Sequence, residues 1–145
     1  MPASSTGTIL RTTAHILNYY GLHTGKQFAT HDGRLDITAA IFRATTGKTP
    51  NCFLTNENAS LLQIQVCEPA MDAIRMVSAV LPTEPSTDPA TGRDDHIEHV
   101  SNWAGPTRPD TDAPTHPEVI GVLLRAATAA DSITAFPHQT ERSAA

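Results

Sequence analysis

Apolar residues recur at intervals of three and four along much of the chain, the spacing that places them on one face of a helix. The best-defined segment runs from Gly33 to Gly47, and its apolar face consists of Ile37, Ala40, Ile41 and Ala44. Asp36 and Arg43 lie where their charges complement the helix dipole, and Gly47 can end the helix. The small alanine side chains let another helix approach closely, so we expect this segment to be the central helix of the fold.

Similar apolar stripes predict helices before and after this segment. They are expected from Ser5 or Thr6 to Gly21, over 58–67, over 69–81 and around Ile97 to Trp103. Pro69 either begins a new helix or kinks one continuous helix. The last helix has the clearest start, because Thr115 and Glu118 match a capping box.

These patterns predict an all-α fold, a single small bundle of about five helices. We expect one core that contains Ile37, Ile41, Trp103 and Leu123. The single helical domain should span residues 6–131. Residues 82–95 and 104–114 are rich in proline and poor in apolar residues, so both are predicted to be flexible loops. Periodicity is lost near Ser132, so residues 132–145 are predicted to form a disordered tail.

The amino-acid composition mainly indicates which kinds of partner the protein can bind. The 145 residues carry a net charge of −5, with 10 Lys and Arg against 15 Asp and Glu. Nucleic acid is therefore an unlikely partner, because counterion release from phosphates requires clustered positive charge. The predicted helices carry about one arginine each, at Arg11, Arg43, Arg75 and Arg125. A helix-turn-helix DNA-binding protein consequently stays a minor alternative.

The chain has no apolar run near the ~20 residues that cross a bilayer, and its N-terminus lacks the pattern of a signal peptide. We therefore expect a cytoplasmic protein with no membrane partner. In a reducing compartment its two cysteines, Cys52 and Cys67, should be free thiols.

Two histidines are the main candidates for a metal site. His96 and His99 are three residues apart, so a helix would place both imidazoles on one side. A site needs at least a third ligand, and Glu98, His116 and Cys67 are all conceivable. The simpler alternative is a pair of exposed histidines beside an acidic loop.

A cysteine nucleophile is a second catalytic hypothesis. Cys52 or Cys67 would need a base such as His23, His31 or His116. The simpler alternative is that both cysteines are small buried hydrophobic residues. No convergent set of titratable residues can be assembled from spacing alone, which favours binding over catalysis.

Candidate binding residues lie at the start of the central helix and beside the tryptophan: His31, Asp32, Arg34 and Trp103. We expect a non-enzymatic cytoplasmic binding or regulatory domain that acts through protein or small-ligand contacts, without a cofactor. The alternative is a small metal-dependent or cysteine-dependent enzyme.

The segment Ala40 to Gly47, Trp103, and the capped helix start at Thr115 to Val119 also resemble a family of small actinobacterial proteins classed as a domain of unknown function. The resemblance covers roughly residues 8–130. It implies no activity, cofactor or catalytic residue. The chain departs from the family pattern at Trp103-Ala104-Gly105, where an acidic residue is expected after the tryptophan.

Overall fold

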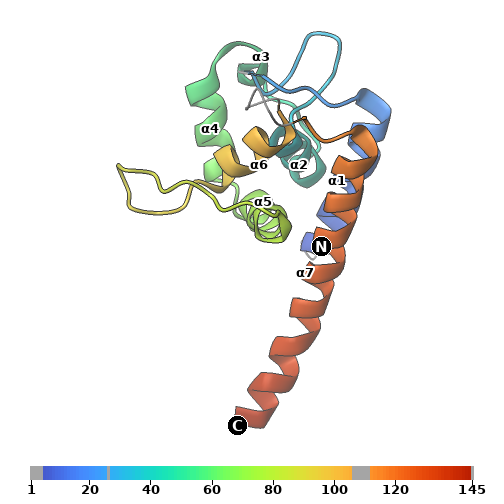
Figure 1. The fold of residues 1–145 in the computed structure, drawn as a ribbon, viewed down its shortest axis with the longest axis vertical. Helices are drawn as coiled ribbons and strands as arrows, with labels where there is room; N and C mark the ends of the chain where they lie inside the picture. Colours follow the sequence, from blue (N-terminus) through green and yellow to red (C-terminus); the bar gives the residue numbers. More distant parts are fainter. Residues whose placement is uncertain (1–4, 26, 106–111, 145) are drawn as a thin grey trace.

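The computed structural model describes residues 5–25, 27–105 and 112–144, with side chains described as far as residue 133, and in these ranges every regular element is a helix (Figure 1). The elements are α1 (Thr6–Tyr20), α2 (Ile37–Thr46), α3 (Cys52–Thr55), α4 (Glu57–Gln65), α5 (Glu68–Val80), α6 (His96–Ala104) and α7 (His116–Ala144). The predicted all-α class is confirmed, but the described chain forms seven helices rather than about five. The short α3 was not predicted, and Pro69 lies in the first turn of α5 instead of kinking one long helix.

The first and last helices pack along each other. α1 contacts α7 and α2, and α5 contacts α7, α2 and α6, so α2 and α5 form the middle of the bundle. An ion pair between Arg11 and Asp131 joins α1 to α7 at the surface. Figure 1 shows α7 continuing well past the other helices. Its backbone is helical to Ala144. The disorder predicted for residues 132–145 stays a prediction.

The central helix is confirmed by its ends and its burial. Asp36 caps α2, with its Oδ1 accepting a hydrogen bond of 2.8 Å from the amide of Thr38. Gly47 ends the helix with φ of +77°, a left-handed conformation that favours glycine. The first six residues of α2, Ile37 to Phe42, are all buried. The dense burial follows from the alanines, which let neighbouring helices approach.

The predicted core is also confirmed. Ile37, Ile41 and Leu123 are buried in one cluster, and Trp103 packs against its edge. The capping box forms as expected, since the Thr115 amide donates to Glu118 Oε1 at 3.2 Å and the Glu118 amide donates to Thr115 Oγ1 at 3.3 Å.

The unpredicted α3 carries the largest fully buried side chain, that of Phe53. Its ring centroid lies 5.8 Å from that of Phe28 and 5.4 Å from that of Phe42. The carbonyl oxygen of Phe53 also accepts backbone hydrogen bonds from Phe28 and Ala29, both at 3.1 Å. One residue therefore fastens the loop between α1 and α2 onto the central helix.

The segment 82–95 folds back on itself. Thr87 and Asp94 form an isolated antiparallel bridge, and the amide of Asp95 donates to the carbonyl oxygen of Ser86 at 2.8 Å. The closure brings the segment alongside the start of α6. The flexibility predicted for it stays a prediction, and most of the second predicted loop, residues 106–111, lies outside the described residues. Over the described chain, none of the helices combines the length and apolar character required to span a bilayer.

The buried cap of α2 gives a prediction about pH. Burial raises the pKa of Asp36 above its ordinary value of 3.8, although hydrogen bonds from Thr38 act in the opposite direction. The folded state therefore binds this proton more tightly than the unfolded state, and the contribution of Asp36 to stability falls as pH rises above about 3.8. Asparagine also caps helices but does not titrate. In urea unfolding, the stability of Asp36→Asn relative to the parent protein should increase as the pH is raised from 4 to 7.

Asp32→Asn is the matched control. Hydrogen bonds from Thr30 and Arg34 lower the pKa of the exposed Asp32 to about 2. Its stabilising effect is therefore present above about pH 3.8 and is lost as pH falls toward 2, so the relative stability of Asp32→Asn should change little between pH 4 and pH 7. The same trend in both variants would contradict the role of burial at Asp36.

Candidate functional site

A cavity of about 490 Å³ lies between α6, the segment after α5 and the start of α7. This volume falls within the range of pockets that hold small ligands. Its described lining residues are Thr83, Glu84, Ser86, Glu98, His99, Asn102, Trp103, Gly105, Asp112, Ala113, Pro114 and Glu118. They come from three separate parts of the chain, so the cavity exists only once α5, α6 and α7 have packed.

Acidic side chains dominate the charge of this cavity, which we call the acidic cavity. Glu84, Glu98, Asp112 and Glu118 line it, and among its described lining residues none is Lys or Arg. A concave surface of one sign of charge concentrates its field and attracts ions of the opposite sign. The acidic cavity therefore attracts cations.

Two of the four carboxylates are held in position by hydrogen bonds. Glu98 Oε1 accepts from Asn102 Nδ2 at 3.3 Å, one turn along α6. Glu118 Oε1 accepts from the amide and hydroxyl of Thr115 as part of the capping box. Each bond uses the Oε1 atom, so the Oε2 atom of both residues has no partner among the described residues. These oxygens can accept hydrogen bonds from a bound molecule.

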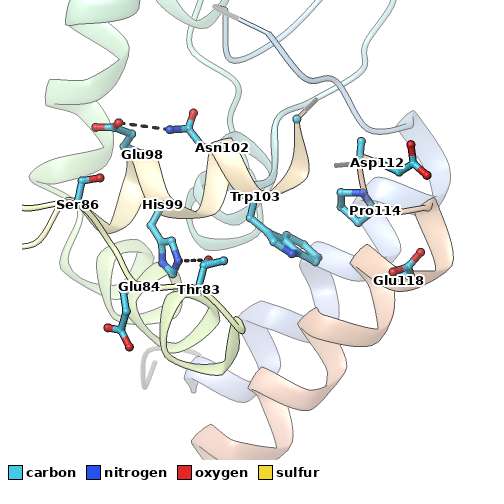
Figure 2. A pocket seen from close by; sticks show the side chains of 12 residues that line it. Thr83, Glu84, Ser86, Glu98, His99, Asn102, Trp103, Asp112, Pro114 and Glu118 are labelled. Atoms are coloured by element: carbon cyan, nitrogen blue, oxygen red, sulfur yellow. Dashed lines mark hydrogen bonds between the residues drawn. The ribbon is translucent and has the colours of Figure 1, made fainter. Parts of the chain in front are cut away.

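Trp103 supplies an aromatic wall. It is half-buried, and Figure 2 shows its indole ring extending from α6 toward α7, on the side of the cavity where Pro114 and Glu118 lie. The face of an indole attracts cations through its quadrupole, with the strongest effect among the aromatic side chains. Trp103 was predicted as a binding residue, and it is the member of that group that lines the acidic cavity.

His99 lies at the base of this site within a chain of hydrogen bonds. Its Nε2 is 2.7 Å from Thr83 Oγ1, and its Nδ1 is 2.6 Å from Ser78 Oγ. His96 Nδ1 lies 2.9 Å from the same Ser78 oxygen. Burial lowers the pKa of His99, and the neighbouring His96 adds to that effect. Both ring nitrogens of His99 are therefore engaged by hydroxyl groups, and its neutral form is favoured.

The metal hypothesis gains no third ligand from the structure. The described part of the chain contains no group of three or more His, Cys, Asp or Glu side chains that could hold a metal ion. His96 and His99 do share one partner, but it is the hydroxyl of Ser78. His116 instead lies with its Nε2 2.7 Å from Asn18 Oδ1 of α1.

The cysteines are free, as expected, and both are half-buried against the core. Neither Cys52 nor Cys67 lines the acidic cavity. The proposed bases are dispersed: His23 and His31 lie in the loop between α1 and α2, whereas His116 begins α7. The structure thus supports their interpretation as packing residues.

The remaining predicted residues form a separate group. His31, Asp32 and Arg34 lie in the loop before α2, and none of them lines the acidic cavity. His31 is exposed, while Arg34 Nε forms an ion pair of 3.1 Å with Asp32 Oδ2. The structure therefore does not bring these three residues together with Trp103.

Several residues of the acidic cavity were missed by sequence reasoning. Glu84 and Asp112 lie in the proline-rich segments that were interpreted as loops, and Thr83 and Asn102 have ordinary surroundings in the sequence. The sequence signal that could have indicated these residues is that both loops are acidic and flank the predicted helix that carries Trp103. Spacing alone does not show that they converge.

Comparison with known proteins defines a family but no activity. No curated protein and no solved structure matches the chain significantly. The model of a family of unknown function, DUF6197, matches residues 1–129, close to the extent of the resemblance carried by the central and last helices. The match includes α1 to α6, Trp103 and the capped start of α7. The chain therefore belongs to the family of unknown function DUF6197.

Proposed function

We propose that this protein binds a small organic cation, an amine or guanidinium compound, in the acidic cavity, and that it is a non-enzymatic cytoplasmic binding or regulatory domain. The observation that carries the proposal is that four carboxylates and one indole line a single cavity. A cation there gains attraction from the carboxylates and from the indole face. The same chemistry would accept a Lys or Arg side chain of a partner protein.

The polar groups of the cavity suit recognition more than catalysis. Glu98 and Glu118 are each fixed by a hydrogen bond on one oxygen, which leaves the second oxygen to orient an N–H donor. His99 is occupied by Ser78 and Thr83. These contacts favour a preorganised binding site, in which little side-chain freedom is lost when the ligand binds.

A regulatory role follows from the position of the cavity. A bound cation would contact the segment after α5, α6 and the start of α7 at the same time. A ligand that binds only the folded arrangement stabilises it by mass action.

A cytoplasmic location is supported by the two free cysteines. The actinobacterial origin suggested by the sequence stays a prediction.

Isothermal titration with agmatine, putrescine and tetramethylammonium tests the proposal, with uncharged 1,4-butanediol as the ligand control. We expect saturable binding of at least one cation that weakens with added salt, and none of the diol. The double variant Glu98→Gln, Glu118→Gln should bind about tenfold more weakly, because two charge-assisted contacts become neutral. Glutamine at position 118 still supports a capping box, so the fold should persist.

The matched control is Glu57→Gln, Glu68→Gln. Both residues are exposed in the first turns of α4 and α5, outside the acidic cavity, and the change in net charge is the same. Equal weakening by the two double variants would mean that the cation responds only to overall charge. That result, or the absence of saturable binding, would overturn the proposal.

A further inference from the structure

A second, smaller cavity lies on another part of the surface, beside the loop that carries the predicted residues His31, Asp32 and Arg34. It has a volume of about 270 Å³. Tyr20, Thr30, Gly33, Arg43, Thr49 and Leu54 line it, together with Ala29 and Leu35. None of these residues lines the acidic cavity. We call this site the Arg43 cavity.

Arg43 is the only charged residue among the described residues that line it. Its side chain is held in place: Nη1 donates to Thr49 Oγ1 at 2.9 Å, and Nη2 donates to Tyr20 Oη at 3.2 Å. The guanidinium carbon also lies 5.1 Å from the centre of the Tyr20 ring. The guanidinium is therefore fixed before any ligand arrives.

Some N–H donors of Arg43 have no partner among the described residues. A guanidinium has five N–H donors and no acceptor. Two N–H groups are used by Thr49 and Tyr20, and Arg43 forms no ion pair within the described residues. Three donors thus remain for an oxyanion, and a carboxylate can accept two of them side by side.

The two hydroxyl groups add to this donor set. Tyr20 Oη and Thr49 Oγ1 each accept a hydrogen bond from Arg43, so each directs its own O–H hydrogen away from the guanidinium. Neither hydroxyl donates to another described residue. An oxygen placed next to Arg43 could therefore receive N–H and O–H donors together.

The rest of the cavity wall is apolar. Ala29 and Leu35 are buried, Leu54 is half-buried, and Gly33 contributes no side chain. Gly33 has φ of +96°, and an added Cβ would lie 3.4 Å from Tyr20 Cδ1, so a larger residue would be strained there and would narrow the space. A small apolar group fits this wall better than a hydrated ion does.

Arg34, a cation in the adjacent loop, is already paired with the carboxylate of Asp32. Its ion pair with Asp32 lies on the same loop, which is closed by a hydrogen bond of 3.0 Å from the Thr30 amide to the Arg34 carbonyl oxygen. The predicted residues Asp32 and Arg34 lie in the loop that contributes Thr30 and Gly33 to the Arg43 cavity but do not line it, and Arg43 is the charged residue among the described residues that does.

From these contacts we infer that the Arg43 cavity binds a small apolar carboxylic acid, with the carboxylate on Arg43, Tyr20 and Thr49 and the apolar body against Ala29, Leu35 and Leu54. The inference does not depend on cation binding in the acidic cavity, because the two sites share none of their described lining residues.

Titration with hexanoate, followed by NMR of the folded protein, tests the inference. We expect saturable binding with a Kd on the order of 1 mM or tighter. Hexanamide and inorganic phosphate should bind at least about tenfold more weakly, because the first lacks the charge and the second lacks the apolar body. Equal affinity for phosphate would overturn the inference, since it would mean that the apolar wall contributes nothing.

Variants separate the site from general electrostatics. Arg43→Gln should weaken hexanoate binding by at least about tenfold, whereas Arg34→Gln removes the same charge from the adjacent loop, outside the lining of the cavity, and should leave binding within about twofold. Equal weakening by both would contradict a specific site. If Arg43→Gln does not fold, Tyr20→Phe keeps the ring and removes one donor, and hexanoate binding unchanged by that substitution would also overturn the inference.

Discussion

Phe53→Ala should lower the free energy of unfolding by about 3–5 kcal/mol, the usual loss when a fully buried phenylalanine is truncated. Phe53 is fully buried, and its ring contacts Phe28 in the loop after α1 and Phe42 in α2. Its removal would leave a cavity where three segments meet. Urea denaturation followed by circular dichroism measures the change, with the midpoint and the slope fitted separately.

Two further variants make the result specific. Phe53→Leu retains most of the apolar volume and should cost clearly less than Phe53→Ala. Leu62→Ala truncates a side chain that is 63% exposed, so it should change the free energy of unfolding by no more than about 0.5 kcal/mol. If Phe53→Ala were as mild as Leu62→Ala, the aromatic cluster would not hold the loop to α2.

His99→Gln is expected to lower the free energy of unfolding by about 1–3 kcal/mol near pH 8, the cost of leaving buried polar groups without their partners. His99 is 7% exposed and joins Ser78 on α5 to Thr83 beyond the end of that helix. A glutamine amide cannot reproduce the two opposed contacts of the imidazole ring. The connection between α5 and α6 should therefore weaken.

The loss of stability caused by His99→Gln should be smaller at lower pH. The pKa of His99 is lowered in the folded state from its ordinary value of 6.5, first by burial and then by the charge of His96. The unfolded state binds the proton more tightly, so the stabilising contribution is present above about pH 6.5 and is lost as pH falls through the lowered pKa. Unfolding measured at pH 8 and at about pH 5 should show the parent protein approaching the variant.

His31→Gln is the matched control for this substitution. His31 is exposed and has no hydrogen bond within the described residues. The same replacement there should leave the free energy of unfolding nearly unchanged. If the free energy of unfolding of His99→Gln varied with pH as that of the parent protein does, the pH dependence would have to come from other groups.

The parts of the fold that were predictable are those set by neighbouring residues in the sequence. The stop at Gly47 and the capping box of Thr115 and Glu118 depend on contacts within a few residues, so their patterns were sufficient. The core positions Ile37, Ile41 and Leu123 followed from helical periodicity. Local rules of helix formation thus explain most of the architecture.

The missed features depend on contacts between distant segments. α3 has only four residues, too few to show a helical period, so the importance of Phe53 was hidden. Ser78 meets His96 and His99 from 18 and 21 residues away, a partnership that HxxH spacing cannot reveal. Glu84 and Asp112 join one cavity from two different loops. Only the packing of α5, α6 and α7 brings these groups together.

The pairing of α1 with α7 also affects when the chain can fold. Arg11 and its partner Asp131 are 120 residues apart, and the apolar face of α1 packs against α7, which is synthesised much later. At roughly 5–20 residues per second, a ribosome needs about 6–24 seconds to make the intervening chain. During that time, α1 has no α7 against which to bury its side chains. The bundle should therefore close only after α7 has emerged, and until then the apolar face of α1 lacks its native packing partner.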